Sequence, residues 1–305
     1  MRPRKIRGLV TLPYPYGMVV INFSYKMRFC AGWKYYTIRH MKERSFLSCP
    51  CGAISLLCRP ASVDEAVALA RTALDAGADG VTVELNRFPV AARTRANFRE
   101  IVSSVPLPFM FTDYREDEFL GADDAARMAS LLTAAAAGAE FVDVMADLYC
   151  PSPLQIATDE AAIARQRQVI GEIHRLGAKA IMSSHILDRA RTADEIVAQL
   201  QAEASRGADI VKLVTMMDTP EAFVEGVRAM TRLRAEMKTP WVFLAGGKYG
   251  RMQRFLGPHF GCAVEFAVHD YIAGTPYNQP TIRNFKKAAA AIAWQMPGDA
   301  GQGCA

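Results

Sequence analysis

The sequence has no apolar run long enough to form a membrane helix. Such a helix needs roughly 18 or more consecutive apolar residues, and Pro, Arg or Asp interrupts the longest candidates in this chain of 305 residues. We therefore expect a soluble protein without a membrane partner. Because 51% of the residues are hydrophobic, a chain of this length can bury one large core.

Closely spaced cysteines are also scarce. Of the seven cysteines only Cys49 and Cys51 lie close together, and no second pair of Cys or His follows at the spacing of a zinc site. A scattered, odd set of cysteines without an export signal is typical of reduced thiols in a cytoplasm. We expect a cytoplasmic protein with no metal ion and no disulfide framework.

Acidic residues are nearly absent from residues 1–50, which contain ten of the 36 Lys and Arg residues but only one acid, Glu43. The rest of the chain is mildly acidic, so nothing in it suggests nucleic-acid binding. The basic segment has neither the apolar core and cleavage site of a secretory signal nor the serines of a transit peptide. Among a targeting peptide, a binding arm and an extension, we favour an N-terminal basic extension that packs on the body or follows an upstream start codon.

A short pattern recurs four times along the chain: a glycine that ends a helix is followed by a brief apolar run. The four glycines are Gly77, Gly138, Gly177 and Gly207. Glycine is the usual residue just past a helix, and runs that are apolar on both faces are typical of parallel strands covered by helices. Ser62 with Glu65 and Thr192 with Glu195 have the spacing of capping boxes at helix starts. These patterns predict repeated βα units.

Counting the apolar runs predicts the fold class. Eight strands are expected near residues 54–58, 81–85, 108–112, 141–145, 180–184, 209–213, 241–245 and 263–267. We predict an α/β fold, a (β/α)₈ TIM barrel over residues 51–295, after the extension at 1–50 and before a tail at 296–305. A doubly wound open sheet is the alternative, but the expected glycine-rich phosphate turn does not follow the first strand.

Catalytic residues of such barrels lie at the carboxyl ends of the strands. The polar residues at those ends are Glu84, Thr112, Asp113, Asp143, His185 and Lys212. Burying the Lys212 ammonium would cost several kcal/mol unless it is paired or neutral. Desolvation lowers the pKa of a buried lysine, and a neutral amine can form an imine with a ketone. The alternative is a lysine that snorkels from a strand end.

Three further residues complete the chemical hypothesis. His185 ends the preceding strand, where it could remove the proton next to an imine and protonate a leaving hydroxyl. Asp143, one strand earlier, could accept a hydrogen bond from the imidazole, although a helix cap or a surface ion pair is equally consistent with its position. In the glycine-rich segment after the seventh strand, Arg254 could bind a carboxylate.

The segments "AIMSSH", "GADIVKLVTMM", "GKYGRMQRF" and "GTPYNQPT", in this order and spacing, resemble the type I 3-dehydroquinate dehydratases, the Schiff-base enzymes of the shikimate pathway of aromatic amino acid biosynthesis. The resemblance implies an imine on Lys212, acid/base catalysis by His185, and a carboxylate contact from Arg254. It also implies a lid with Gln279 and Thr275, a substrate contact from Glu84, and Asp143 orienting the histidine. No cofactor is implied.

The chain also departs from the family pattern. Asn86 stands at a family arginine, with Arg87 one residue later. After the third strand either Tyr114 replaces a second arginine or Arg115 supplies it. Glu118 corresponds to a family glutamate near the histidine only if Tyr114 is the counterpart. The residues expected to form and use the imine are retained, while the residues expected to bind the hydroxyl groups of the substrate are altered.

We therefore predict a lyase that dehydrates 3-dehydroquinate or a close cyclic hydroxy-keto acid, with Lys212 and His185 as acting groups. The alternatives are a Schiff-base lyase on a different ketone in specialised metabolism and a non-catalytic metabolite sensor. We expect a keto-acid substrate as the partner and, as is common for such barrels, a homodimer.

Overall fold

The computed structural model describes residues 8–14, 17–23, 44–49, 52–271 and 278–292. It consists of two units, Met1–Arg44 and Ser45–Ala305. In the first unit, β1 (Gly8–Tyr14) and β2 (Gly17–Phe23) pair antiparallel, with Gly8 opposite Phe23 and Tyr14 opposite Gly17. The sequence analysis did not predict this hairpin. Residues 50 and 51, where we expected the barrel to begin, and the tail at 296–305 lie outside the described residues.

The second unit contains one sheet of eight parallel strands in the order β10-β3-β4-β5-β6-β7-β8-β9. The strands are β3 (Ala53–Cys58), β4 (Gly80–Glu84), β5 (Phe109–Thr112), β6 (Phe141–Met145), β7 (Lys179–His185), β8 (Ile210–Met216), β9 (Trp241–Gly246) and β10 (Val264–Ala267). The backbone N–H of Ala263, just before β10, donates to the carbonyl of Trp241 in β9, at 2.8 Å. The sheet is therefore a nearly closed barrel, which confirms the predicted (β/α)₈ fold.

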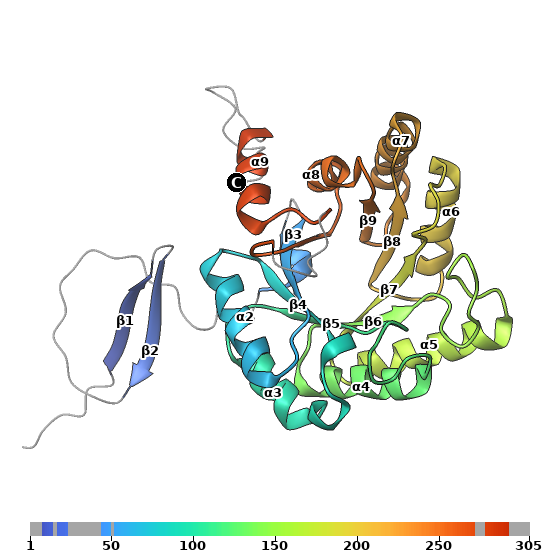
Figure 1. The fold of residues 1–305 in the computed structure, drawn as a ribbon. Helices are drawn as coiled ribbons and strands as arrows, with labels where there is room; N and C mark the ends of the chain where they lie inside the picture. Colours follow the sequence, from blue (N-terminus) through green and yellow to red (C-terminus); the bar gives the residue numbers. More distant parts are fainter. Residues whose placement is uncertain (1–7, 15–16, 24–43, 50–51, 272–277, 293–305) are drawn as a thin grey trace, which may run out of the picture. The chain divides into compact units, whose positions relative to one another are not determined.

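Helices alternate with these strands and surround them (Figure 1). They are α2 (Val63–Asp75), α3 (Arg95–Ser103), α4 (Asp124–Ala137), α5 (Glu160–Arg175), α6 (Ala193–Ala204), α7 (Pro220–Glu236), α8 (Gly250–Phe260) and α9 (Ile282–Ile292), with single 3₁₀ turns at Phe46–Ser48, Leu85–Arg87 and Val90–Ala92. Among the described helices, none is both long and apolar enough to span a bilayer.

The recurring glycine pattern has a simple backbone explanation. Gly77, Gly138, Gly177 and Gly207 all adopt positive φ, between 75° and 107°, a region that residues with a Cβ rarely occupy. The helix starts agree with the sequence as well. The Ser62 side chain accepts from the Glu65 N–H, and Thr192 with Glu195 forms a complete capping box. Glycines just past the helices and capping residues at their starts thus determine where the helices of the βα units begin and end.

Strand register decides which side chains share a height in the barrel. In the β7–β8 pair Ser183 lies opposite Lys212, and His185 lies opposite Val214. In the β6–β7 pair Asp143 lies opposite Ile181. Lys212 therefore lies two residues closer than His185 to the amino-terminal end of the barrel strands, and Asp143 lies four residues closer. Side chains of alternate residues point the same way, so Lys212 and His185 can face one cavity at the carboxyl ends of the strands.

Candidate active site

A cavity of about 430 Å³ opens at the carboxyl ends of the barrel strands. It is lined by residues from all eight strands, from the loops that follow them and, for Arg254, from α8: Leu57, Arg59, Thr82, Glu84, Asn86, Thr112, Tyr114, Arg115, Glu116, Met145, Gln155, His185, Leu187, Lys212, Val214, Leu244, Arg254, Phe266, Asn278 and Gln279. A cavity of this size holds a small ring compound. The two residues predicted to do the chemistry, Lys212 and His185, both line it.

Lys212 is buried in β8, with 5% of its surface exposed. Its amine donates a hydrogen bond to the Tyr114 hydroxyl at 2.9 Å, and lies 5.0 Å from the ring centre of Phe266. Burial lowers the pKa of Lys212, while the carboxylates of Asp143 and Glu84 oppose that shift. None of the described carboxylates forms an ion pair with the amine. The group is thus a desolvated amine that opens into a cavity.

Tyr114, in the loop after β5, lies at the centre of the polar groups around Lys212. Its hydroxyl accepts from Lys212 and donates to Asp143 Oδ2, both at 2.9 Å. Ser183 donates to the other oxygen of Asp143 at 2.7 Å. Burial raises the pKa of Tyr114 well above its usual value, and the nearby Asp143 and Glu84 carboxylates add to this shift. The phenol is therefore protonated and connects the amine to a carboxylate.

His185 stands against the edge of the Tyr114 ring, with ring centroids 4.6 Å apart and planes at 72°. Its backbone N–H donates to Gln155 Oε1 at 2.7 Å, which fixes the end of β7. Burial lowers the pKa of His185 well below 6.5, and the positive charges of Lys212 and Arg254 lower it further. The imidazole is thus neutral at pH 7 and can accept a proton from a bound molecule.

Asp143 does not orient this imidazole, contrary to our expectation. Both of its oxygens accept hydrogen bonds from other groups, Tyr114 and Ser183. The register explains the difference, because Asp143 lies opposite Ile181, four residues below His185 along β7. Asp143 is 1% exposed, and burial raises the pKa of its carboxyl group while Lys212 lowers it. The Asp143 carboxyl group therefore lies on the Lys212 side of the site, where Tyr114 joins the two groups.

Glu84, at the end of β4, lines the cavity as predicted, but its partner was missed. Arg59 Nε lies 3.1 Å from Glu84 Oε1. Burial raises the pKa of Glu84, and Arg59 opposes the shift. Arg59 directly follows β3, so the same rule of strand ends would have found it. Arg59 therefore brings a cation to the same cavity as Asn86, the residue at the position where the family pattern has an arginine.

Four polar groups of the cavity wall are buried and have no hydrogen-bond partner among the described residues. They are Arg254 Nη1, Asn86 Oδ1, Gln279 Oε1 and Thr112 Oγ1. Arg254 is 3% exposed, and its Nε donates to the Ala245 carbonyl at 3.0 Å. Because an unpaired buried polar atom costs about 1–3 kcal/mol, these groups are candidate partners for a molecule bound in the cavity.

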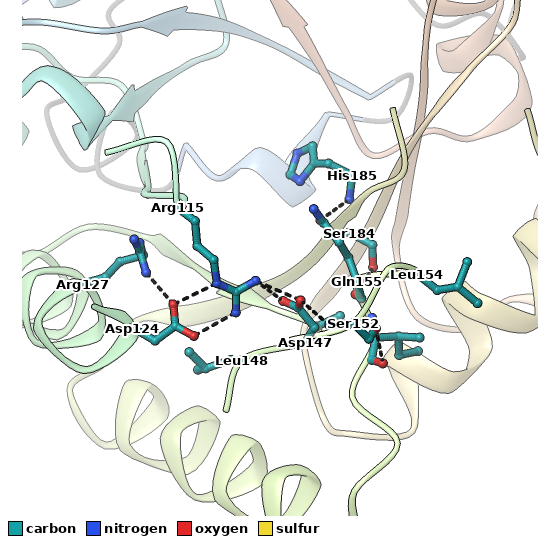
Figure 2. A network of polar contacts seen from close by, with 12 residues as sticks. Arg115, Asp124, Arg127, Asp147, Leu148, Ser152, Leu154, Gln155, Ser184 and His185 are labelled. Atoms are coloured by element: carbon teal, nitrogen blue, oxygen red, sulfur yellow. Dashed lines mark hydrogen bonds and ion pairs between the residues drawn. The ribbon is translucent and has the colours of Figure 1, made fainter. Parts of the chain in front are cut away.

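Arg115 is held away from the ligand space although it backs the cavity. Figure 2 shows its guanidinium between two carboxylates, and the contacts are 2.8 and 3.1 Å to Asp124 and 2.9 and 3.0 Å to Asp147. Four charge-assisted hydrogen bonds use nearly all of its donors. Arg115 therefore lines the cavity with a guanidinium whose donors are largely engaged by two aspartates, and its predicted contact with substrate stays a prediction.

The loop after β6 is what Arg115 stabilises. Asp147 accepts from the Ser152 N–H at 3.1 Å, and the Gln155 N–H donates to the Ser152 carbonyl at 2.9 Å. Gln155 has a φ of 45°, an unfavourable value for a residue with a Cβ, and its side chain reaches the cavity and the His185 backbone (Figure 2). The sequence carried no signal for Gln155.

Two other predicted residues lie outside the cavity. Arg87 and Glu118 pair with each other at 3.7 Å, and their side chains are 55% and 62% exposed. The Glu118 N–H donates to the Asn86 carbonyl at 2.8 Å, while the Glu118 side chain is mostly exposed to solvent. Neither residue contacts the groups around Lys212.

Thr275, the other residue predicted for the lid, lies outside the described residues. Within the described ranges no three metal-ligating side chains come together.

Substitution of Arg115 and substitution of Arg87 should affect the stability of the fold to very different extents. Arg115→Met should lower the free energy of unfolding by about 3 kcal/mol, because it leaves Asp147, 2% exposed, without its charge partner. Arg87→Met should change it by no more than about 0.5 kcal/mol, since its ion pair is exposed. Urea titration of both variants measures the difference. Equal destabilisation would contradict the assignment of the two arginines.

Comparison with protein families gives one match that spans most of the barrel. The family described as type I 3-dehydroquinase matches residues 59–293. The 3-dehydroquinate dehydratase of Klebsiella pneumoniae is 28% identical over 222 residues, which cover 70% of this chain and 84% of that protein. The protein from Alkaliphilus oremlandii with the same name is 35% identical over 100 residues, 32% of this chain and 39% of that protein.

Solved structures agree on the fold. The 3-dehydroquinate dehydratase from Geobacillus kaustophilus superposes with a TM-score of 0.68 at 18% identity, covering 79% of this chain and 90% of that one. The type I enzyme from Clostridium difficile, whose structure is described with covalently modified comenic acid, gives 0.67 at 17% identity, covering 79% and 92%.

Proposed function

The chain belongs to the type I 3-dehydroquinase family of hydro-lyases, and we propose that it dehydrates 3-dehydroquinate through an imine on Lys212. The observation that carries this proposal is the placement of Lys212 and His185 in one cavity of about 430 Å³. Lys212 there is a desolvated amine, and His185 is a neutral base. An imine-forming amine next to a neutral base is the pair that such a dehydration needs.

The chemistry assigns a separate task to each group. The Lys212 amine adds to the ring ketone and water leaves, which gives an iminium ion. This cation makes the neighbouring C–H acidic by accepting the electron pair that the carbon releases. His185 removes that proton and then returns a proton to the hydroxyl on the next carbon, which departs as a second water. Hydrolysis of the product imine regenerates the amine.

The cavity wall supports a substrate with one carboxylate and several hydroxyl groups. The unpaired Nη1 of Arg254 suits a carboxylate oxygen. The unpaired oxygens of Asn86, Gln279 and Thr112 are acceptors for hydroxyl donors. A cyclic hydroxy-keto acid such as 3-dehydroquinate supplies both kinds of partner, together with the ketone that Lys212 needs.

Borohydride trapping tests the proposal directly. The protein is incubated with 3-dehydroquinate and sodium borohydride, and its peptides are mapped by mass spectrometry. We expect one covalent adduct, on Lys212, and growing enone absorbance when the reductant is omitted. Lys179, which is half-exposed and pairs with Glu140 at 3.2 Å, serves as the internal reference for nonspecific reaction. Absence of both adduct and absorbance at saturating substrate would refute the proposal.

A second candidate is an imine-forming lyase that acts on a different cyclic ketone. It is favoured by Asn86 at one family arginine position and by the engagement of Arg115, one of the two candidates for the second position, with two aspartates. A good charged contact carries about 1–3 kcal/mol of discrimination. A panel of hydroxy-keto acids separates the candidates, because strong turnover of 3-dehydroquinate alone excludes the second. The homodimer and the cytoplasmic location stay predictions.

A further inference from the structure

The Tyr114 side chain contacts three buried groups that can exchange protons, namely Lys212, Asp143 and His185. Its hydroxyl lies 2.9 Å from Lys212 Nζ and 2.9 Å from Asp143 Oδ2. Its ring packs edge-on against His185. The two hydrogen bonds point in one direction, since the amine donates to the phenol and the phenol donates to the carboxylate. This is the arrangement of a proton relay.

The residue type is important for this arrangement. In one of the two assignments that the sequence leaves open, Tyr114 stands where the family pattern has an arginine, and a guanidinium has five donors but no acceptor. An arginine could not accept a hydrogen bond from Lys212, and its positive charge would repel the ammonium. A phenol both accepts and donates, so a tyrosine at position 114 provides a continuous path from the amine to Asp143.

We propose that Tyr114 relays a proton between Lys212 and Asp143 during imine formation, an inference that rests on the proposed function. Asp143 is suited to the acceptor role because it is 1% exposed and makes no ion pair with a described residue. Ser183 donates to its other oxygen at 2.7 Å, which leaves Oδ2 for Tyr114. His185 is thereby freed for the later proton abstraction.

The proposed step conserves protons and charge. The Lys212 ammonium passes a proton to the Tyr114 oxygen while the Tyr114 proton moves to Asp143, which leaves a neutral amine, an intact phenol and a carboxylic acid. The amine adds to the ketone, and a proton shift from nitrogen to oxygen gives the neutral carbinolamine. Asp143 returns its proton through Tyr114 to the carbinolamine hydroxyl, which leaves as water. The iminium ion carries the positive charge that Lys212 held at the start.

The experiment measures single-turnover borohydride trapping on Lys212 across pH. Tyr114→Phe keeps the ring against His185 but removes the relay, and we expect trapping at pH 7 to slow by about 10²–10³-fold. The deficit should shrink as the pH rises, because hydroxide in solution can then deprotonate the amine. A role of Tyr114 in packing alone predicts a deficit that does not depend on pH. Tyr149→Phe, which removes a phenol hydroxyl from the loop after β6 outside the cavity, should trap at the wild-type rate.

Asp143→Asn provides a second variant in which Tyr114 is intact. The relay predicts the same slow, pH-dependent trapping, and a double variant no slower than either single variant. If Tyr114→Phe does not fold, Asp143→Asn alone tests the relay through the same pH dependence. Trapping at the wild-type rate in either folded variant, or a deficit that is constant with pH, overturns the relay while the proposed function stands. No adduct in the wild-type protein would instead refute the proposed function.

Discussion

Lys212→Met should abolish turnover of 3-dehydroquinate, with kcat at least about 10⁴-fold below that of the unchanged protein. Methionine matches the length of the lysine side chain and suits the buried surroundings next to Phe266, but it has no amine to form the imine. Without an iminium ion, no group among the described residues can accept the electron pair released on proton abstraction. Enone absorbance under saturating substrate measures the loss.

Lys179→Met is the matched control for this substitution. Lys179 begins β7, at the end of the barrel opposite to the cavity, and its half-exposed ammonium pairs with Glu140 at 3.2 Å. Its removal should leave kcat unchanged and shift the melting temperature little, because exposed pairs contribute about 0–1 kcal/mol. A Lys212→Met protein that melts normally and keeps more than a few per cent of its activity would contradict an imine mechanism.

The position of Lys212 could be predicted from the sequence for a physical reason. In a parallel sheet covered by helices, strands are short apolar runs between a glycine and a helix cap, so both their order and their ends are local properties of the chain. Adjacent strands then bring His185 and Lys212 to one mouth without any knowledge of tertiary contacts, although Lys212 lies in the first half of β8 (Ile210–Met216) and not at its end. All eight predicted strands correspond to observed ones, with ends that differ by at most three residues.

The arginines could not be assigned in the same way. Arg87 and Arg115 both follow strand ends, but their directions depend on partners from elsewhere in the chain. Arg115 is held by Asp124 at the start of α4 and by Asp147 after β6, whereas Arg87 finds only the exposed Glu118. Loop side chains take their orientation from such tertiary contacts. Gln155 and the Tyr114–Asp143 hydrogen bond were missed for the same reason.

His185→Asn should stop the reaction one step later than Lys212→Met does. Asparagine is polar and fits the place of an imidazole, but its amide does not exchange protons near neutral pH. We expect kcat to fall by about 10²–10⁴-fold while imine formation continues. Borohydride should then trap an adduct on Lys212 that is one water heavier than the adduct of the dehydrated product. An adduct of the dehydrated product, or turnover close to that of the unchanged protein, would contradict the assignment.

The pH profile of the unchanged protein tests the same assignment without a substitution. Burial, Lys212 and Arg254 lower the pKa of His185 well below 6.5, so the imidazole stays a neutral base to a lower pH than a solvated histidine does. The acid limb of kcat/KM, where protonation of the base removes activity, should therefore lie well below pH 6.5. The control variant His174→Asn removes an exposed imidazole in α5, which pairs with Asp209, and should leave the profile unchanged. An acid limb near 6.5 would mean that the base is a solvated histidine, which the geometry of the cavity does not allow for residue 185.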